Sequence, residues 1–227
     1  MKAVYKVCIG LFLSSAEIVV RFLTELCSWF GVDLMLGRKY PGILLTDGLK
    51  TFGLSTVQSG LSGDFIGIEF PITIIGLCLT AWGCFELRQY HKRFTTAAGF
   101  ALGTSVSYIG MKVIPLFTPT GEEIGIYGLI VLILVKILLE SAMLFSIARA
   151  MGRQVDSYLY MELEQDLQFA FQLYVISSGV TYILSVFRAI DLVQIFFMIG
   201  CLGCLGACFY YSIRMYHYTK KLKLFAV

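Results

Sequence analysis

Two ionisable residues, Lys136 and Glu140, lie in the middle of a long apolar stretch, residues 124–147. They are four residues apart, so on a helix their side chains share one face and lie one turn from each other. Charged groups within a membrane commonly mark ion pathways, proton relays or sites for charged solutes. A structural role also fits, in which the lysine and the glutamate neutralise each other and fix one packing register. The spacing leaves both interpretations open.

A second set of charges recurs at helical spacing near the amino terminus. Glu17, Arg21 and Glu25 are four residues apart and form one stripe along a helix predicted over residues 7–30. Near a helix centre each charge costs about 2.5–3.5 kcal/mol on insertion, and each large apolar residue returns about 0.3–0.6 kcal/mol. The helix therefore either lies in the membrane interface or spans the membrane with its stripe facing other helices. We favour the spanning arrangement.

These two sets of charges can compensate each other. Together with Lys112 in a neighbouring apolar segment, the acids are as numerous as the bases: Glu17, Glu25 and Glu140 against Arg21, Lys112 and Lys136. The totals allow a buried cluster without net charge. We expect segments 7–30 and 124–148 to be neighbours, with Arg21 near Glu140. Lys136 is expected near Glu17 or Glu25.

A third group of residues is basic and lies where two apolar segments end. Its members are Arg88, His91, Lys92, Arg214 and His217. Together they suit an anionic lipid headgroup or a phosphate group. The usual excess of positive charge on the cytoplasmic side of a membrane protein explains the same residues, and it is the simpler interpretation.

Motifs typical of enzymes and metalloproteins are absent from the sequence. It contains no His-Glu-x-x-His, no Gly-x-Ser-x-Gly and no phosphate-binding glycine-rich loop. Cys201, Cys204 and Cys208 share one helix face, but no second cluster of Cys or His completes a set of metal ligands. We interpret these cysteines as packing residues. We predict no catalytic residues, no metal site and no cofactor, and nothing supports nucleic-acid binding.

The composition determines which elements must position these residues. The chain has 227 residues, of which 58% are hydrophobic and 15% charged, and its mean hydropathy is +0.80. Soluble domains carry about a quarter charged residues, and a membrane-spanning helix needs about 20 apolar residues. We predict an all-α polytopic transmembrane bundle that forms one domain over residues 1–227. Its expected spans cover residues 7–30, 65–87, 96–117, 124–148, 167–189 and 192–213, and residues 31–64 form a long external loop.

The distribution of basic residues predicts the orientation. With these spans, one side of the membrane carries Lys2, Lys6, Arg88, Lys92, Arg93, Arg149, Arg153, Arg214, Lys220, Lys221 and Lys223. The other side carries Arg38, Lys39, Lys50 and Arg188. The positive-inside rule makes the first side cytoplasmic. We therefore expect a multi-pass protein of the cell membrane with both termini in the cytoplasm.

Small residues recur every four positions in several of the predicted spans. The sets are Gly76, Thr80 and Cys84; Gly99, Gly103 and Ser107; Ser177, Thr181 and Ser185; and Gly200, Cys204 and Cys208. Such faces let helix backbones approach closely within a membrane. The alternative is a polar pathway lined by the hydroxyl groups. We favour packing.

These observations favour a transport-type or solute-binding membrane protein that uses the charges around Lys136 and Glu140. The alternative is a non-catalytic accessory, regulatory or lipid-interacting subunit that has the bilayer and another membrane subunit as partners. A membrane enzyme with its chemistry near His91 and His217 is a third, less favoured possibility. In size and number of spans the chain looks like the substrate-binding subunits of energy-coupling-factor vitamin transporters. That resemblance is one of architecture alone, and it implies solute binding.

Overall fold

The computed structural model describes residues 2–29, 69–117, 123–153, 157–186 and 191–221, and the described part forms α-helices joined by short turns, with no strand. The predicted external loop, residues 31–64, lies outside the described residues. The helices are α1 (Lys2–Ser14), α2 (Ala16–Trp29), α4 (Glu69–Leu87), α5 (Arg93–Phe117), α6 (Glu123–Gly152), α7 (Ser157–Val186) and α8 (Asp191–Lys221).

Within the described residues, 4 stretches are long and apolar enough to cross a membrane. They are Lys2–Leu23, Glu69–Leu87, Val131–Gly152 and Ile195–Lys220. The all-α fold and its membrane character agree with the sequence prediction. Helices α5 and α7 are not among these stretches.

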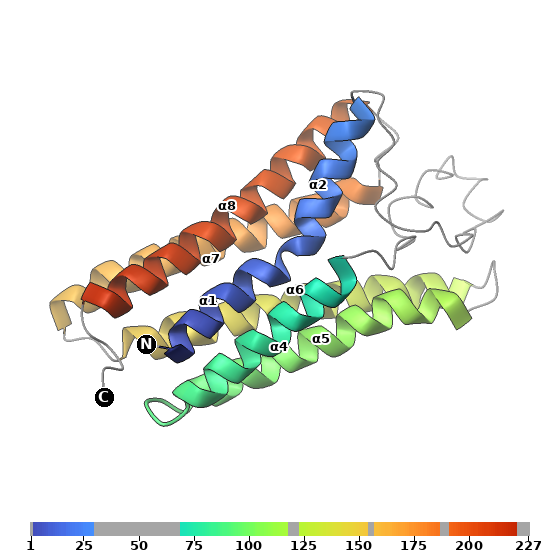
Figure 1. The fold of residues 1–227 in the computed structure, drawn as a ribbon. Helices are drawn as coiled ribbons and strands as arrows, with labels where there is room; N and C mark the ends of the chain where they lie inside the picture. The colour runs from blue at the N-terminus through green and yellow to red at the C-terminus, as the bar shows by residue number, and fades with distance from the viewer. Residues whose placement is uncertain (1, 30–68, 118–122, 154–156, 187–190, 222–227) are drawn as a thin grey trace.

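The first predicted span, residues 7–30, is interrupted rather than continuous. It begins at Lys2 and is broken between α1 and α2 at Ser15. The hydroxyl of Ser14 donates to the carbonyl of Leu11 at 2.8 Å, and that of Ser15 donates to the carbonyl of Phe12 at 2.7 Å. Such local hydroxyl bonds compete with the helical ladder and bend helices. Figure 1 shows α2 leaving the direction of α1 and running toward α8.

The acidic stretch around Asp166 lies inside a helix, whereas the sequence pattern predicted it before a helix that begins at residue 167. Helix α7 begins at Ser157. Asp166 accepts hydrogen bonds from the hydroxyls of Tyr210 at 3.2 Å and Tyr218 at 3.0 Å, and it pairs with Nε of Arg214 at 3.4 Å. Helix α8 supplies all three partners. These contacts stabilise a polar turn of α7, and α8 also extends past residue 213, its predicted end, to Lys221.

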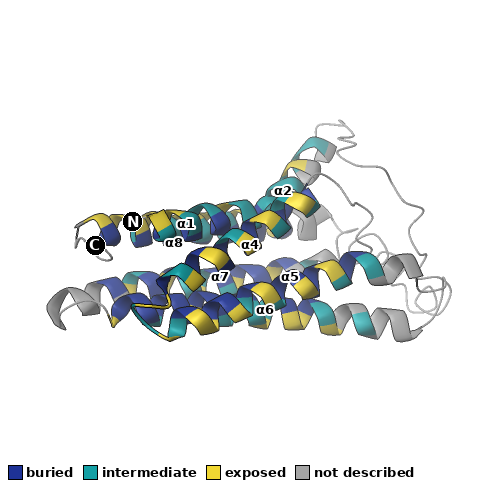
Figure 2. Cartoon of the chain, turned by 60° about the horizontal axis from the view of Figure 1, so that its bottom comes forward, coloured by how far each residue is buried: buried dark blue, intermediate teal, exposed yellow. Residues whose placement is uncertain are grey.

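The helices form a closed ring in the order α1, α4, α5, α6, α7, α8, with α1 also in contact with α8. Sequence neighbours from α4 onward run antiparallel, and the start of α1 lies at the same end of the bundle as the end of α8 (Figure 1). In Figure 2 the buried residues gather on the faces that the helices turn toward one another. All six helices of the ring contribute buried side chains to the main hydrophobic cluster.

Close contacts between small residues occur in two of the helix pairs, between backbones in α1–α4 and between a backbone and a side chain in α7–α8. A Cβ atom on Gly10 of α1 would lie 2.6 Å from the carbonyl oxygen of Gly76 in α4. A Cβ atom on Gly200 of α8 would lie 2.5 Å from the hydroxyl oxygen of Thr181 in α7. The faces that contain Gly76 and Thr181 are therefore packing faces, as expected. Gly99 differs, because a Cβ atom there would meet nothing within 4 Å.

Candidate functional site

Lys136 lies near the middle of α6 between two carboxylates. Its Nζ donates to Oε2 of Glu17 at 2.8 Å and lies 3.7 Å from Oε1 of Glu140. The three residues are between 3% and 6% exposed. The expected contact between Lys136 and Glu17 is confirmed. The expectation that segments 7–30 and 124–148 are neighbouring helices is wrong, because α1 and α2 pack on α4 and α8, and α1 lies opposite α6 in the ring. Two long side chains make the contact across the bundle.

Arg21 completes the charge around Glu17. Its Nη2 donates to Oε1 of Glu17 at 2.8 Å, and its side chain is 26% exposed. Arg21 and Glu140 line the same cavity, but the ion pair described for Arg21 is with Glu17. The side chain of Glu25 lies outside the described residues, so its predicted role stays a prediction.

Tyr174 of α7 is a partner that the sequence analysis missed. Its hydroxyl donates to Oε2 of Glu140 at 2.6 Å, and the residue is 7% exposed. A tyrosine in an apolar helix usually packs in the core, so its spacing carries no signal of a polar role. The bond becomes visible only because α6 and α7 are adjacent in the ring.

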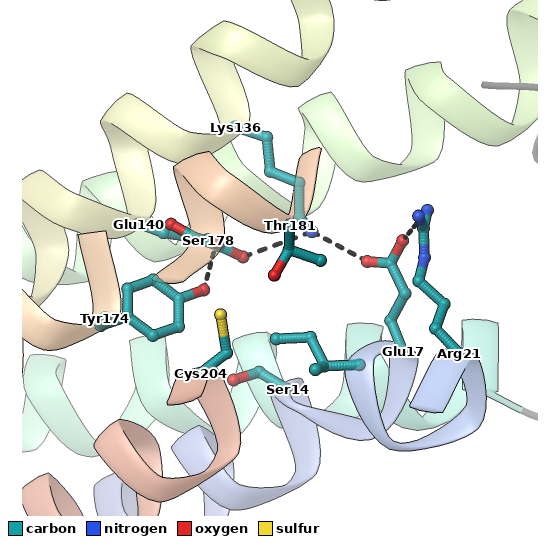
Figure 3. A pocket seen from close by; sticks show the side chains of 10 residues that line it. Ser14, Glu17, Arg21, Lys136, Glu140, Tyr174, Ser178, Thr181 and Cys204 are labelled. Atoms are coloured by element: carbon teal, nitrogen blue, oxygen red, sulfur yellow. Dashed lines mark hydrogen bonds and ion pairs between the residues drawn. The ribbon is translucent and has the colours of Figure 1, made fainter. Parts of the chain in front are cut away.

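A small cavity lies beside these groups, as Figure 3 shows. Its volume is about 20 Å³, and it is lined by Ser14, Glu17, Ile18, Arg21, Lys136, Glu140, Tyr174, Ser178, Thr181 and Cys204. A buried water needs about 10–15 Å³ of such space, so the cavity suits one small polar molecule or ion. The hydroxyls of Ser178 and Thr181 donate to backbone carbonyls at 3.1 Å and 2.7 Å. Their oxygens therefore keep lone pairs for a guest.

A second buried ion pair lies between α4 and α5. Oε1 of Glu69 is 3.9 Å from Nζ of Lys112, and the two residues are 4% and 7% exposed. The ring of Tyr108 lies near both buried lysines, with centroid distances of 5.9 Å to Nζ of Lys112 and 5.2 Å to Nζ of Lys136. A lysine ammonium at this distance is attracted to the aromatic face. Glu69 had not been singled out from the sequence.

The described charges of the two ion-pair groups balance. The acids are Glu17, Glu69 and Glu140, and the bases are Arg21, Lys112 and Lys136. The sequence analysis also predicts a neutral cluster, but it counts Glu25 as the third acid and does not include Glu69. Buried charges are tolerated when each has an opposite charge nearby.

The five basic residues proposed for a lipid headgroup fall into two subsets. Arg88, His91 and Lys92 follow α4, whereas Arg214 and His217 lie on α8, and α1 contacts both helices and lies between them. Arg214 is paired with Asp166. Partial burial and the nearby positive charges of Arg153, Arg93 and Lys92 lower the pKa of His91 below its usual value.

No protein-family model, no curated protein and no solved structure matches this sequence. Among the residues that the structure describes, no group of three or more His, Cys, Asp or Glu side chains is arranged to hold a metal ion. Cys201 and Cys204 are buried in α8. The groups that the site brings together are two carboxylates, a lysine ammonium, an arginine guanidinium and a tyrosine hydroxyl beside a small cavity.

Proposed function

We propose that this chain is a transport-type membrane protein that binds a small cation, a proton included, at Glu140. The observation that carries the proposal is that Lys136 lies closer to Glu17 than to Glu140. Glu17 accepts hydrogen bonds from both Arg21 and Lys136 at 2.8 Å. Glu140 lies 3.7 Å from Lys136 and accepts one hydrogen bond from the neutral hydroxyl of Tyr174.

Because Glu140 is less tightly paired than Glu17, Glu140 is the carboxylate that a cation can approach. An ionised carboxylate in an apolar interior is unfavourable unless it is paired and hydrogen-bonded. The cavity lies directly against Glu140 and is large enough for one water-sized guest. A cation bound there lets Lys136 stay with Glu17, so binding does not require the larger cluster to separate.

The outward faces of the helices support a bundle of six spans. Helices α5 and α7 turn large apolar side chains outward, since Val106 is 69% and Ile176 is 65% exposed. Such side chains suit lipid better than water. We propose that α5 and α7 also span, in a cell membrane, with both termini in the cytoplasm. The basic residues at the end of α4 and the end of α8 support this orientation.

Ligand-induced stabilisation tests the cation site. The melting temperature of the purified protein in detergent would be compared in LiCl, NaCl, KCl and choline chloride at equal ionic strength, and at several pH values. We expect one small cation, or a change of pH, to shift the melting temperature of the parent by a few degrees. Glu140→Gln should remove that response while still folding.

The matched control is Glu86→Gln, because Glu86 also pairs with a lysine, Lys6, but about one third of each side chain is exposed. This variant should respond to the cations as the parent does. If Glu140→Gln and Lys136→Leu both fold and also respond as the parent does, the buried charges are structural and the proposal fails.

A second candidate function is that of an accessory or lipid-interacting subunit. The observation in its favour is the exposure of basic side chains at the end of the bundle that carries the termini, namely Arg88, Lys92 and His217. Arg88 stacks its guanidinium 4.0 Å from the ring of Phe85, which leaves its charge at the rim of the bundle. Cations so placed attract anionic lipid headgroups.

A further inference from the structure

Two buried hydroxyl groups of the α4–α5 pair have no hydrogen-bond partner among the described residues. They are Oη of Tyr108 and Oγ1 of Thr73, and the two residues are 0% and 1% exposed. Nearly all buried polar groups in proteins are hydrogen-bonded, and exceptions commonly mark a bound water or ion. These two hydroxyls therefore point to a small polar guest inside the bundle.

The same two residues flank the second ion pair. Thr73 follows Glu69 by one helical turn on α4, and Tyr108 precedes Lys112 by one turn on α5, so each shares a face with its charged neighbour. Glu69 and Lys112 are 3.9 Å apart, which exceeds the length of a hydrogen bond. A polar contact of this length is often bridged by water.

Tyr108 also links this region to the candidate site. Its ring lies within 6 Å of both buried lysines, Lys112 and Lys136. Glu69 is the first residue of α4, which begins short of the far ends of α5 and α6 (Figure 1), and Lys136 lies near the middle of α6. The polar residues thus continue from the buried start of α4 toward the middle of α6.

We propose that Glu69, Lys112, Thr73 and Tyr108 form a second binding site, which holds internal water and is the route by which a proton reaches Glu140. Water at this position accepts hydrogen bonds from Lys112 and Tyr108 and donates to Glu69 and Thr73, so both unsatisfied hydroxyls gain a partner. The delivery of a proton to Glu140 rests on the proposed function, whereas the presence of water does not.

Radiolytic hydroxyl labelling with mass spectrometry tests for the water, because the radicals form from water in place and modify adjacent side chains. The matched control is Tyr211, which is 1% exposed and donates its hydroxyl to the carbonyl of Leu144 at 2.8 Å. In the full chain in detergent, Tyr108 should be labelled several-fold faster than Tyr211. Equal rates of labelling would overturn the water site.

Proton flux into liposomes that contain the protein and a pH-sensitive dye tests the route. Tyr108→Phe keeps the ring and removes the hydroxyl, so it should slow the flux several-fold while the response of the melting temperature to cations or pH persists. Tyr5→Phe on the exposed face of α1 is the control and should leave the flux unchanged. An unchanged flux in Tyr108→Phe would overturn the route.

Radiolytic labelling of Tyr108 and the melting-temperature response of Glu140→Gln together separate the water site from the cation site. Fast labelling of Tyr108 in a protein whose Glu140→Gln variant responds like the parent keeps the water site and rejects the cation site. Slow labelling with a lost response in Glu140→Gln keeps the cation site and rejects the water site.

Discussion

Glu17 is the carboxylate of the charged cluster that pairs with two cations. It is 3% exposed and accepts one hydrogen bond from α2 and one from α6. Its two cationic partners are a lysine that is 4% exposed and an arginine at the edge of the cavity. The loss of its charge would remove the nearer of the two carboxylates that pair with Lys136, at 2.8 Å against 3.7 Å for Glu140.

We expect Glu17→Gln to be the most destabilising single neutralisation in the cluster. Removal of one partner of a buried ion pair typically lowers the free energy of unfolding by about 3–5 kcal/mol. Unfolding in mixed detergent and sodium dodecyl sulfate would measure the loss. Glu86→Gln serves as control, because its exposed ion pair with Lys6 contributes little. Equal stability of the two variants would contradict the central place of Glu17.

At the scale of the residue, the sequence predicts contacts between charged residues better than contacts of charged residues with neutral partners. The contact of Lys136 with Glu17 follows from helical spacing and from the cost of an unpaired charge in lipid. This reasoning does not identify Tyr174 and Tyr108. A tyrosine can pack in the core or bond to a charged group, and its presence in an apolar helix does not require a charged partner. The same reasoning does not predict a partner for Glu69, because the helix dipole alone explains an acid in the first turn of a helix.

At the scale of the helix, small residues decide where backbones touch. The α1–α4 crossing brings the backbone nitrogen of Ser14 within 2.4 Å of the place where a Cβ atom on Gly76 would lie. Backbone atoms on both sides leave no flexible group to move aside. The same spacing of small residues around Gly99 makes no such contact.

Gly76→Ala should therefore destabilise the protein, and Gly99→Ala should not. Overpacking of a tight contact typically costs about 1–3 kcal/mol, whereas alanine at an open helix position is favoured over glycine by up to about 1 kcal/mol. The difference in melting temperature between the two variants measures the effect. A Gly76→Ala protein as stable as the parent would show that α1 and α4 do not cross this closely.

Helix ends are the part of the fold that periodicity predicts least well. The helix that contains Asp166 was predicted to begin ten residues later than Ser157, because acidic residues before an apolar run usually precede a helix. Its polar turns are instead stabilised by Tyr210, Arg214 and Tyr218 of α8. The break at Ser15 is equally invisible, since serine occurs in many unbroken membrane helices.

At the scale of the whole molecule, the exposed surface decides between a protein that acts alone and a subunit. The described helices expose large apolar side chains along most of their length, among them Trp82 at 59% and Leu138 at 67%. Lipid and a partner subunit suit such apolar faces equally, so these faces do not decide between the two cases. The basic rim at the end that carries the termini is the chemically distinct part of this surface.

Native mass spectrometry distinguishes the two cases. If the chain acts alone, we expect a monodisperse protein from mild detergent that carries no second subunit and shows no preference for added phosphatidylglycerol over phosphatidylcholine. Retention of phosphatidylglycerol that is lost in Arg88→Gln and Lys92→Gln would favour the lipid-interacting alternative, as would a copurifying membrane subunit. Thr95→Ala, an exposed and uncharged change nearby, is the control.

The charges around the cavity form two neutral pairs, one on α2 beyond the break at Ser15 and one on α6. Glu17 and Arg21 both lie on α2, one helical turn apart, and Lys136 and Glu140 are related in the same way on α6. A swing of α2 about Ser15 would part Glu17 from Lys136 and leave each pair with its own acid and base. Such a swing would not pull net charges apart, because the two groups that separate are each neutral.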